Sequence, residues 1–392
     1  MDNQLIVSVT ERESFHRCPQ QWHYGSLNRR GLALVEAPSF HLSVGSICHH
    51  GVDVLAVTRD VEKMQASVDE FIERLHEKAV KEYEQFASSF PSGGWQAEWK
   101  ELSWLSRQML GYYVERYGTD PFEPFELIGS EVTFLIEVPG TDSLLTGTID
   151  RVLQDRYTGQ IWVGETKTFS QAPDPALLQQ HDQMGKYLWA LTQLLPNEEV
   201  GGALYDGLSK EIPRKPRVLP SNGKLSREAI PTTPALFREA MAEIGADEDD
   251  EYYVEHLAKL DSQFAQDVGS FFIRHKLRWT PAQHAQSQND LVAEIKAMEY
   301  AHKNDVVFPV QWFSWMYDSC HRCPFYEPCF SHMRGEYAWE EEVLSTKYVT
   351  LNPVGYTTGE MMKKIKDKAI EPSKVSSIDD LRGVLTGRSA LG

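Results

Sequence analysis

The chain is poor in positive charge. It carries 39 lysines and arginines against 57 aspartates and glutamates, which gives a formal net charge of −18 at pH 7. This balance excludes a general nucleic-acid coat, because a protein that covers phosphates needs positive charge over much of its surface. Only a local basic track is compatible with such a composition.

Long apolar runs are also missing. No uninterrupted apolar stretch approaches the roughly 20 residues that span a bilayer. The opening sequence MDNQLIVSVTERESF has no basic segment followed by an apolar core, so we expect no signal peptide and no membrane partner. We therefore expect a soluble, cytoplasmic protein. The pattern GxxxxGK[ST] is absent as well, which indicates that the chain carries no ATPase motor of its own.

Cysteine is scarce, with 5 in 392 residues. An odd number in a cytoplasmic chain favours metal or cluster ligation over disulfides. Three of them form a compact Cys320-x2-Cys323-x5-Cys329 set, and a fourth thiolate would have to come from Cys18 or Cys48, far upstream. The spacing alone fits zinc and a [4Fe–4S] cluster about equally.

Hydrophobic periodicity predicts an α/β core. The predicted helices lie at 11–30, 43–58, within 60–118, at 177–195 and at 281–302, and the predicted strands at 131–138, 143–155, 160–168, 202–208 and 271–279. The order strand–strand–strand–helix–strand in the middle of the chain is typical of a mixed central sheet flanked by helices.

The same patterns suggest one main domain, residues 1–335. Within it, 60–118 reads as a helical insertion and 318–332 as the cysteine-bearing segment. We expect the tail, 336–392, to be loosely packed, because it shows little periodicity.

Two short stretches could supply the local basic track. The segment from Lys210 to Arg227 holds six basic residues against Glu211 alone. On the strand at 271–279, a period of two would place three basic side chains on one face, namely those of Arg274, Lys276 and Arg278.

The clearest chemical signal is a set of carboxylates beside a lysine. Asp150 ends a strand in Gly-Thr-Ile-Asp-Arg, and Glu165-Thr166-Lys167 lies on the next strand. Alternation puts Glu165 and Lys167 on the same face. Two carboxylates at neighbouring strand positions can hold Mg²⁺, and a lysine beside them can orient a water or offset phosphate charge. Without other features, however, such a set is usually a surface salt-bridge ladder.

Two flanking features change this interpretation. A Gly45-x-x-x-His49 sequence lies on a predicted helix upstream, and Gln183 and Tyr187 share one face of a predicted helix downstream. Each feature is unremarkable alone. Together, in the order G-x-x-x-H, G-x-I-D-R, E-x-K and Q-x-x-x-Y, they make the chain resemble the RecB-like branch of the PD-(D/E)XK nucleases, which includes Cas4. The resemblance covers about residues 10–50 and 128–330.

The resemblance implies a restriction-endonuclease-like core and a role for each motif residue. It implies that Mg²⁺ or Mn²⁺ is held by His49, Asp150, Glu165 and the backbone carbonyl of Thr166. Lys167 would be the catalytic lysine, and Gln183 and Tyr187 would position DNA or that lysine. Only the G-x-x-x-H spacing selects His49 over the adjacent His50, and the role of Glu131, on the preceding strand, stays open.

The resemblance also decides the cysteine question. Members of this group hold a [4Fe–4S] cluster with one N-terminal cysteine and a C-terminal C-x2-C-x5-C. Cys18 matches the former, in the context Phe15-x-x-Cys18-Pro19-x-x-Trp22. The implied ligands are Cys18, Cys320, Cys323 and Cys329. Cys48 is then a buried helix residue, and the cluster clasps the N- and C-terminal segments together.

We therefore expect a metal-dependent DNA exonuclease that acts on ends or single strands in recombination or repair. A phage or mobile-element enzyme with a helicase or recombination partner fits the length and the missing motor. Two alternatives remain, a non-catalytic DNA-binding or assembly protein that kept the fold and cluster, and a zinc-stabilised interaction module. Intact Asp150, Glu165 and Lys167 weigh against the first, and metal analysis separates the second.

Overall fold

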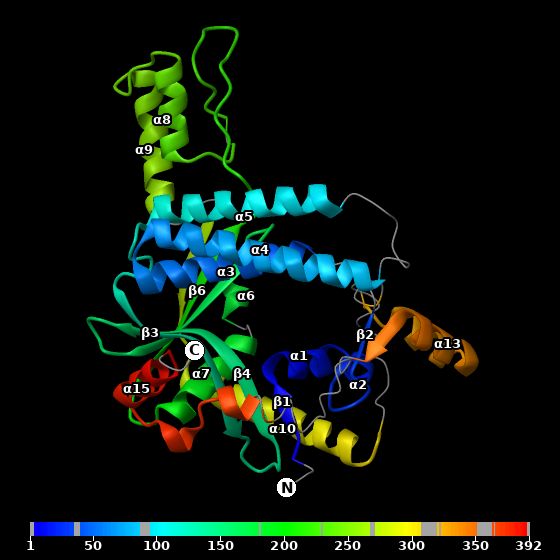
Figure 1. The fold of residues 1–392 in the computed structure, drawn as a ribbon. Helices are drawn as coiled ribbons and strands as arrows, with labels where there is room; N and C mark the ends of the chain where they lie inside the picture. The colour runs from blue at the N-terminus through cyan, green and yellow to red at the C-terminus, as the bar shows by residue number, and fades with distance from the viewer. Residues whose placement is uncertain are drawn as a thin grey trace.

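A mixed β-sheet lies at the centre of the molecule, with helices on both faces (Figure 1). The computed structural model describes residues 4–34, 40–86, 95–179, 182–228, 230–266, 271–306, 320, 323–350, 363 and 365–389. The sheet strands are β1 (Ile6–Ser8), β3 (Phe125–Glu137), β4 (Leu144–Asp155), β5 (Ile161–Phe169), β6 (Val200–Ser209) and β7 (Phe272–Leu277). The predicted α/β class with a mixed sheet is confirmed.

The strand order creates a fork in the sheet. The path runs β1-β4-β5-β6-β7, with β3 paired along the other edge of β4. β5 pairs with β4 only from Arg151↔Gly164 to Gln154↔Ile161, and β1 pairs with the same edge of β4 farther along, at Leu144 to Thr146. β4 and β5 therefore separate at the residues that follow Gly164 and precede Arg151.

Helices cover both faces of the sheet, and two further groups, α8 with α9 and α12 with α13, lie farther from it (Figure 1). The helices are α1 (Val9–Arg17), α2 (Pro19–Gly25), α3 (Phe40–Thr58), α4 (Val61–Phe86), α5 (Trp95–Tyr117), α6 (Pro175–Leu178), α7 (Asp182–Leu194), α8 (Pro234–Glu243), α9 (Glu251–Ala265), α10 (Pro281–Lys303), α12 (Tyr326–Met333), α13 (Tyr337–Lys347) and α15 (Ile378–Ser389). α3, α4 and α5 cover one face of the sheet and α7, α10 and α15 the other (Figure 1). Each face thus has its own apolar core.

Two predicted helices are interrupted. The helix expected over 11–30 is α1 and α2, because Cys18 is extended (φ −160°, ψ 110°) and Pro19 begins the second helix. A residue before proline avoids the helical region, which explains the break. The helix expected over 177–195 is α6 and α7, and residues 180 and 181 lie outside the described part.

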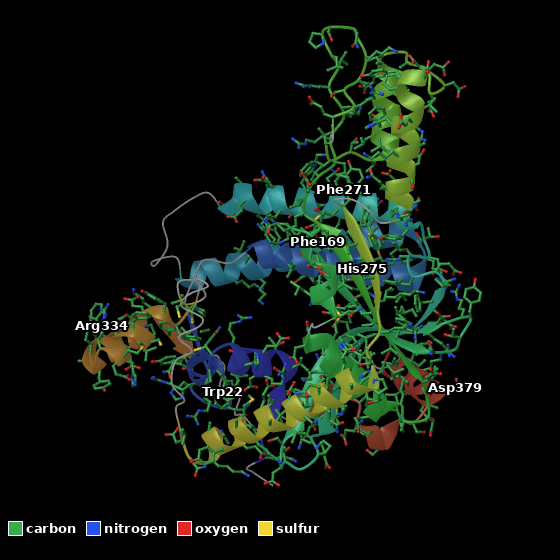
Figure 2. All side chains as sticks on the ribbon, turned by 180° about the vertical axis from the view of Figure 1, so that it is seen from behind. Trp22, Phe169, Phe271, His275, Arg334 and Asp379 are labelled. Carbon is green, nitrogen blue, oxygen red and sulfur yellow. The ribbon has the colours of Figure 1, made fainter. Side chains whose placement is uncertain are left out.

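The expectation of a loosely packed tail is wrong for the described part of residues 336–392. A short sheet pairs β2 (Leu32–Leu34) with β8 (Tyr348–Thr350), and Ile370 and Leu381 are fully buried in the main core. Figure 2 shows Arg334, at the end of α12, and Asp379, in α15, on opposite sides of the molecule. The described parts of the tail therefore pack against the rest of the protein, using apolar residues too sparse to give a periodic signal.

The basic segment from Lys210 to Arg227 lies in an outlying part of the molecule, where several of its basic side chains form ion pairs. It rises with α8 and α9 as an arm beyond α5 (Figure 1). Lys215 pairs with Glu239 and Glu243 at 2.6 Å, and Lys224 pairs with Asp250 at 2.8 Å. Ion pairs with acidic residues that lie later in the sequence thus neutralise part of its positive charge.

Part of the basic face of β7 contributes to packing within the protein. Arg274 pairs with the buried Asp206 at 2.6 Å and lies over the Tyr117 ring. Lys276 and Arg278 lie over the aromatic ring of Trp162. Alternation was predicted correctly, but Arg274 is largely buried in its ion pair, so that only Lys276 and Arg278 are exposed on this face.

A glycine in β6 gives a test of this packing. Gly202 has φ 149°, and a Cβ there would lie 2.1 Å from the carbonyl oxygen of Leu277 on β7. We expect Gly202→Ala to lower the free energy of unfolding by about 3 kcal/mol, because the backbone conformation and the close approach both exclude a side chain. Gly159→Ala is the matched control, since Gly159 also has positive φ but open space around it; there the loss should be about 1 kcal/mol. Equal losses in urea denaturation would contradict this interpretation.

Candidate active site

The fork between β4 and β5 brings the carboxylate set together. Asp150 is the first β4 residue beyond the paired segment, and Glu165 is the corresponding residue of β5. Because the backbone pairing stops here, the Thr166 N–H is free of the β4 ladder and donates to Asp150 Oδ2 at 3.1 Å. A side chain thus takes the place of a backbone partner.

Helix α3 adds His49 to this group. His49 Nε2 lies 2.5 Å from the Thr166 carbonyl oxygen, and Nδ1 lies 3.4 Å from Asp150 Oδ2. The imidazole, the Asp150 carboxylate and the Thr166 carbonyl therefore converge from three elements. His50 points elsewhere, since its Nε2 contacts Ser67 Oγ of α4 at 2.8 Å and its ring stacks on Phe71.

Glu165 lies at the closed end of the site. It is 1% exposed and forms an ion pair with Lys167, which is half-buried on the same face of β5. Burial, and then the negative charge of Asp150, raise the pKa of Glu165 to about 7. Its second oxygen, Oε2, is buried and has no hydrogen-bond partner among the described residues.

These groups fit a divalent cation. The donor set is two carboxylates, a carbonyl oxygen and an imidazole, which suits Mg²⁺ or Mn²⁺ with waters completing the shell. A cation would also supply the missing partner of the buried Glu165 oxygen and relieve its repulsion with Asp150. Sequence reasoning selected all four of these positions. His49, Asp150 and the Thr166 carbonyl contact one another, and Glu165 adjoins them on β5.

The two motif residues of α7 face the same site. Gln183 Nε2 donates to the Tyr187 hydroxyl at 3.0 Å. Tyr187 is buried, and its pKa is raised first by burial and then by the charge of Glu165. The pair therefore lies close to the carboxylate set, on the side of the sheet opposite His49.

A match to known proteins now fixes the family. A family model described as the PD-(D/E)XK nuclease superfamily matches residues 6–330. The chain belongs to this superfamily. Membership supports metal-dependent nuclease chemistry, and the matched range contains every motif described above. No curated protein matches the chain significantly. Among the described helices, none combines the length and apolarity needed to cross a bilayer.

A buried ion pair behind the PD-(D/E)XK site was not predicted. Arg151 is fully buried; its Nε donates to Asp53 at 2.7 Å and its Nη1 to Thr166 Oγ1 at 2.6 Å. Asp53 lies one turn after His49 on α3, so the pair fixes the histidine helix to both forked strands. Two features of the sequence could have indicated this pair: Asp53 follows His49 by four residues on the same helix, and Arg151 directly follows Asp150.

Asp53 also belongs to a second group of ligand atoms. One ligand atom each from His49, Asp53 and Glu131 lie within 4.8 Å of one another. Glu131 lies on β3 between Ser130, which pairs with Arg151, and Val132, which pairs with Ile149, and it has φ 52°, a conformation that residues other than glycine seldom adopt. Burial, Asp53 and Asp150 raise the pKa of Glu131. The site is therefore rich in negative charge, which a cation would offset.

The cysteines gather at a second place. Cys18, Cys320, Cys323 and Cys329 line one cavity together with Tyr24 and Phe325. Burial, together with a smaller effect of the neighbouring cysteines, raises the pKa of the Cys323 thiol to about 11 and that of the Cys329 thiol to about 12. Cys48 lies instead in the apolar core beneath α4 and α5. The fold thus brings Cys18, and not Cys48, to the C-terminal set.

Proposed function

We propose that this nuclease is a Mg²⁺- or Mn²⁺-dependent deoxyribonuclease of the RecB-like group, which includes Cas4, and that it acts on DNA ends or single strands. The observation that carries the proposal is the convergence of His49, Asp150, Glu165 and the Thr166 carbonyl at the sheet fork, beside Lys167. Superfamily membership supports hydrolysis of a nucleic acid, and the intact set of metal and lysine groups favours a catalytic protein over a binding-only relative.

Each residue then has a definite task. When bound, the metal ion supplies Lewis-acid stabilisation of the phosphate and lowers the pKa of a coordinated water. Asp150, Glu165 and His49 would hold this ion. Lys167 presents its ammonium group toward the scissile phosphate and offsets its negative charge, while its ion pair with Glu165 restricts the rotamers of its long side chain. Gln183 and Tyr187 border the same space and orient the DNA or the lysine.

The cavity formed by the cysteines supports a second part of the proposal. Four thiolates from two distant segments can hold a [4Fe–4S] cluster, which would tie the α1–α2 junction to α12. The cavity is lined by aromatic rings, and Tyr24 and Phe325 stack with ring centroids 5.4 Å apart. We assign the cluster a structural role. A zinc ion in the same thiolate set is the alternative that metal analysis would reveal.

The biological setting follows from what the chain lacks. Since the sequence has no phosphate loop, unwinding of duplex ends would need a helicase or recombination partner. We place the enzyme in recombination or repair of a phage or mobile element. The family match to residues 6–330 supports a nuclease domain over 1–335, with α4 and α5 as its helical insertion and 318–332 as its cluster segment.

The direct test compares the wild type with Lys167→Ala on end-labelled single- and double-stranded DNA. We expect cleavage only with Mg²⁺ or Mn²⁺, and a rate lower by about a hundredfold in the variant, since one preorganised cationic group is lost. Closed circular DNA of the same sequence should resist the wild type if ends are required. Cleavage that persists in EDTA, or a fully active Lys167→Ala protein, would overturn the proposal.

A further inference from the structure

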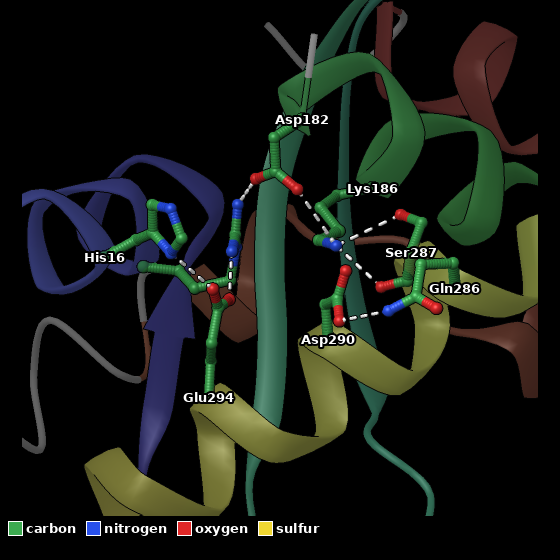
Figure 3. A network of polar contacts seen from close by, with 8 residues as sticks. His16, Asp182, Lys186, Gln286, Ser287, Asp290 and Glu294 are labelled. Atoms are coloured by element: carbon green, nitrogen blue, oxygen red, sulfur yellow. Dashed lines mark hydrogen bonds and ion pairs between the residues drawn. The ribbon is translucent and has the colours of Figure 1, made fainter. Parts of the chain in front are cut away.

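Helix α7 presents three distinct faces. At 3.6 residues per turn, Met184, Leu188 and Leu191 form its apolar face, and all three are fully buried. Gln183 and Tyr187 form the face toward the carboxylate set. The third face is polar and consists of Asp182, Gly185 and Lys186, which lie at i, i+3 and i+4. This polar face meets α1 and α10 (Figure 3).

A buried arginine from α1 connects this face to α10. Arg12 is 1% exposed and forms ion pairs with Asp182, the first residue of α7, and with Glu294 of α10. His16, one turn later on α1, lies 2.8 Å from the second oxygen of Glu294. Figure 3 shows Asp182 of α7 and Glu294 of α10 close to His16 of α1. One cation therefore links three helices.

A lysine one turn along α7 makes a second connection. Lys186 is fully buried and donates to the Ser287 carbonyl and hydroxyl oxygens of α10, at 2.7 and 3.0 Å, and lies 3.1 Å from Asp182 Oδ1. Gly185 permits this close approach, because a Cβ there would lie 2.8 Å from Ser287 Oγ. The two contacts fix both the position of α7 and its rotation about its own axis.

These contacts flank the two site residues in the sequence. Asp182 precedes Gln183, and Lys186 precedes Tyr187, so any rotation of α7 that releases the polar face also turns the site face away from Glu165. Charged groups in such a place seldom add stability, since their desolvation offsets much of their attraction, but they can select one arrangement of packed helices. An apolar contact would tolerate small rotations that this geometry excludes.

From this geometry we infer that Arg12 is a positioning residue for the reaction, which acts through α7 on Gln183 and Tyr187 without touching the DNA or the metal. The inference rests on the proposed nuclease function. It also gives α1 a role beyond leading to Cys18, because this helix, which ends at Arg17, sets the orientation of α7 through Arg12.

The test is a double-mutant cycle between Arg12→Met and Tyr187→Phe, measured as kcat and KM for single-stranded DNA cleavage. We expect Arg12→Met to lower kcat by about tenfold or more, since small misplacements of positioning groups are costly, with the Mn²⁺ affinity of the protein unchanged. The double variant should have a kcat no lower than that of the slower single variant, because both changes disrupt the same contribution of Tyr187 to the reaction. Additive losses, or an unchanged kcat in Arg12→Met, would overturn the inference.

Arg29→Met is the matched control. Arg29 is equally buried and also ties the N-terminal segment to the end of α10, through Ala301, Asp305 and Val306, none of which belongs to α7. Arg29→Met should lower Tm to a similar extent as Arg12→Met and leave kcat within about twofold, because losing contacts that do not involve α7 does not rotate that helix. A kcat loss equal to that of Arg12→Met would assign both effects to general destabilisation.

Two further measurements keep the outcomes separate. If Arg12→Met does not fold, Asp182→Asn replaces it, since Asp182 is half exposed and its change leaves the Arg12–Glu294 pair in place; the same non-additivity with Tyr187→Phe is expected, and additivity again counts against the inference. Lys167→Ala is run beside them. A wild type no more active than Lys167→Ala contradicts the proposed nuclease, whereas a normal Lys167 effect with an inert Arg12 contradicts only the positioning role.

Discussion

Asp150→Ala is expected to lower metal-dependent DNA cleavage by about a thousandfold or more. Asp150 contacts both the Thr166 backbone and His49, so it lies at the centre of the donor set. Replacing a group that only supports a metal ligand typically costs roughly 10- to 100-fold in metal affinity or activity, and loss of a ligand itself should cost more. The measurement is single-turnover cleavage of end-labelled DNA at saturating Mn²⁺.

The fold of the variant should survive, and this separates catalysis from stability. Without metal, the Asp150 carboxylate raises the pKa of Glu165 by repulsion, so its removal relieves a conflict. Mn²⁺ should raise the Tm of the wild type, because a ligand that binds only the folded state stabilises it, and should leave the Tm of Asp150→Ala almost unchanged.

Asp155→Asn is the matched control for this experiment. Asp155 lies at the end of the same strand and accepts bonds from the Tyr157 and Thr158 amides of the adjacent turn, away from the donor set. It should retain full cleavage and the Mn²⁺ effect on Tm. Full activity in Asp150→Ala, or a lost Mn²⁺ effect in Asp155→Asn, would refute the ligand assignment.

The second large effect concerns iron. We expect protein purified without oxygen to be brown and to hold about four irons per chain, as a [4Fe–4S] centre requires. Cys18→Ser and Cys329→Ser should each lose most of that iron and much of their solubility, because a bound cluster contributes directly to the folding free energy of the segments it joins. Iron and zinc analysis with visible absorption spectra measures the loss.

Cys48→Ser supplies the comparison within the same chain. Cys48 is fully buried in a different core, and burial raises the pKa of its thiol to about 12, as expected of a thiol packed among apolar side chains. The variant should keep its iron, with at most a modest drop in Tm. One zinc per chain instead of iron, or iron that depends on Cys48 and not on Cys18, would contradict the assignment.

The sequence was a good guide where one local pattern determined the outcome. Alternation predicted that Glu165 and Lys167 share a face, and the i, i+4 rule predicted the same of Gln183 and Tyr187. It gave the order of β3, β4, β5, α7 and β6 as well, because each element has its own apolar period.

It was a poor guide where partners lie far apart in the chain. The fork arises because β1 pairs with Leu144 to Thr146, and the hydrophobic periodicity of neither segment predicts that pairing. Arg274 and Lys215 looked like candidates for phosphate contacts, but their partners, Asp206 and Glu239, are set by tertiary packing. The buried links made by Arg151 and Arg12 were missed for the same reason, since a charged residue in a helix or strand usually faces water.

The position of β1 makes the beginning of the described chain a wedge. Residues Ile6 to Ser8 occupy the edge of β4 that β5 would otherwise continue along, and so they keep the two strands apart near the proposed metal ligands Asp150 and Glu165. More than a hundred residues separate β1 from β4 in the sequence. Contacts between such distant segments form slowly, and β1 can pair only after β4 has formed. The spacing of β4 and β5 at Asp150 and Glu165 thus depends on a pairing between strands that lie far apart in the sequence.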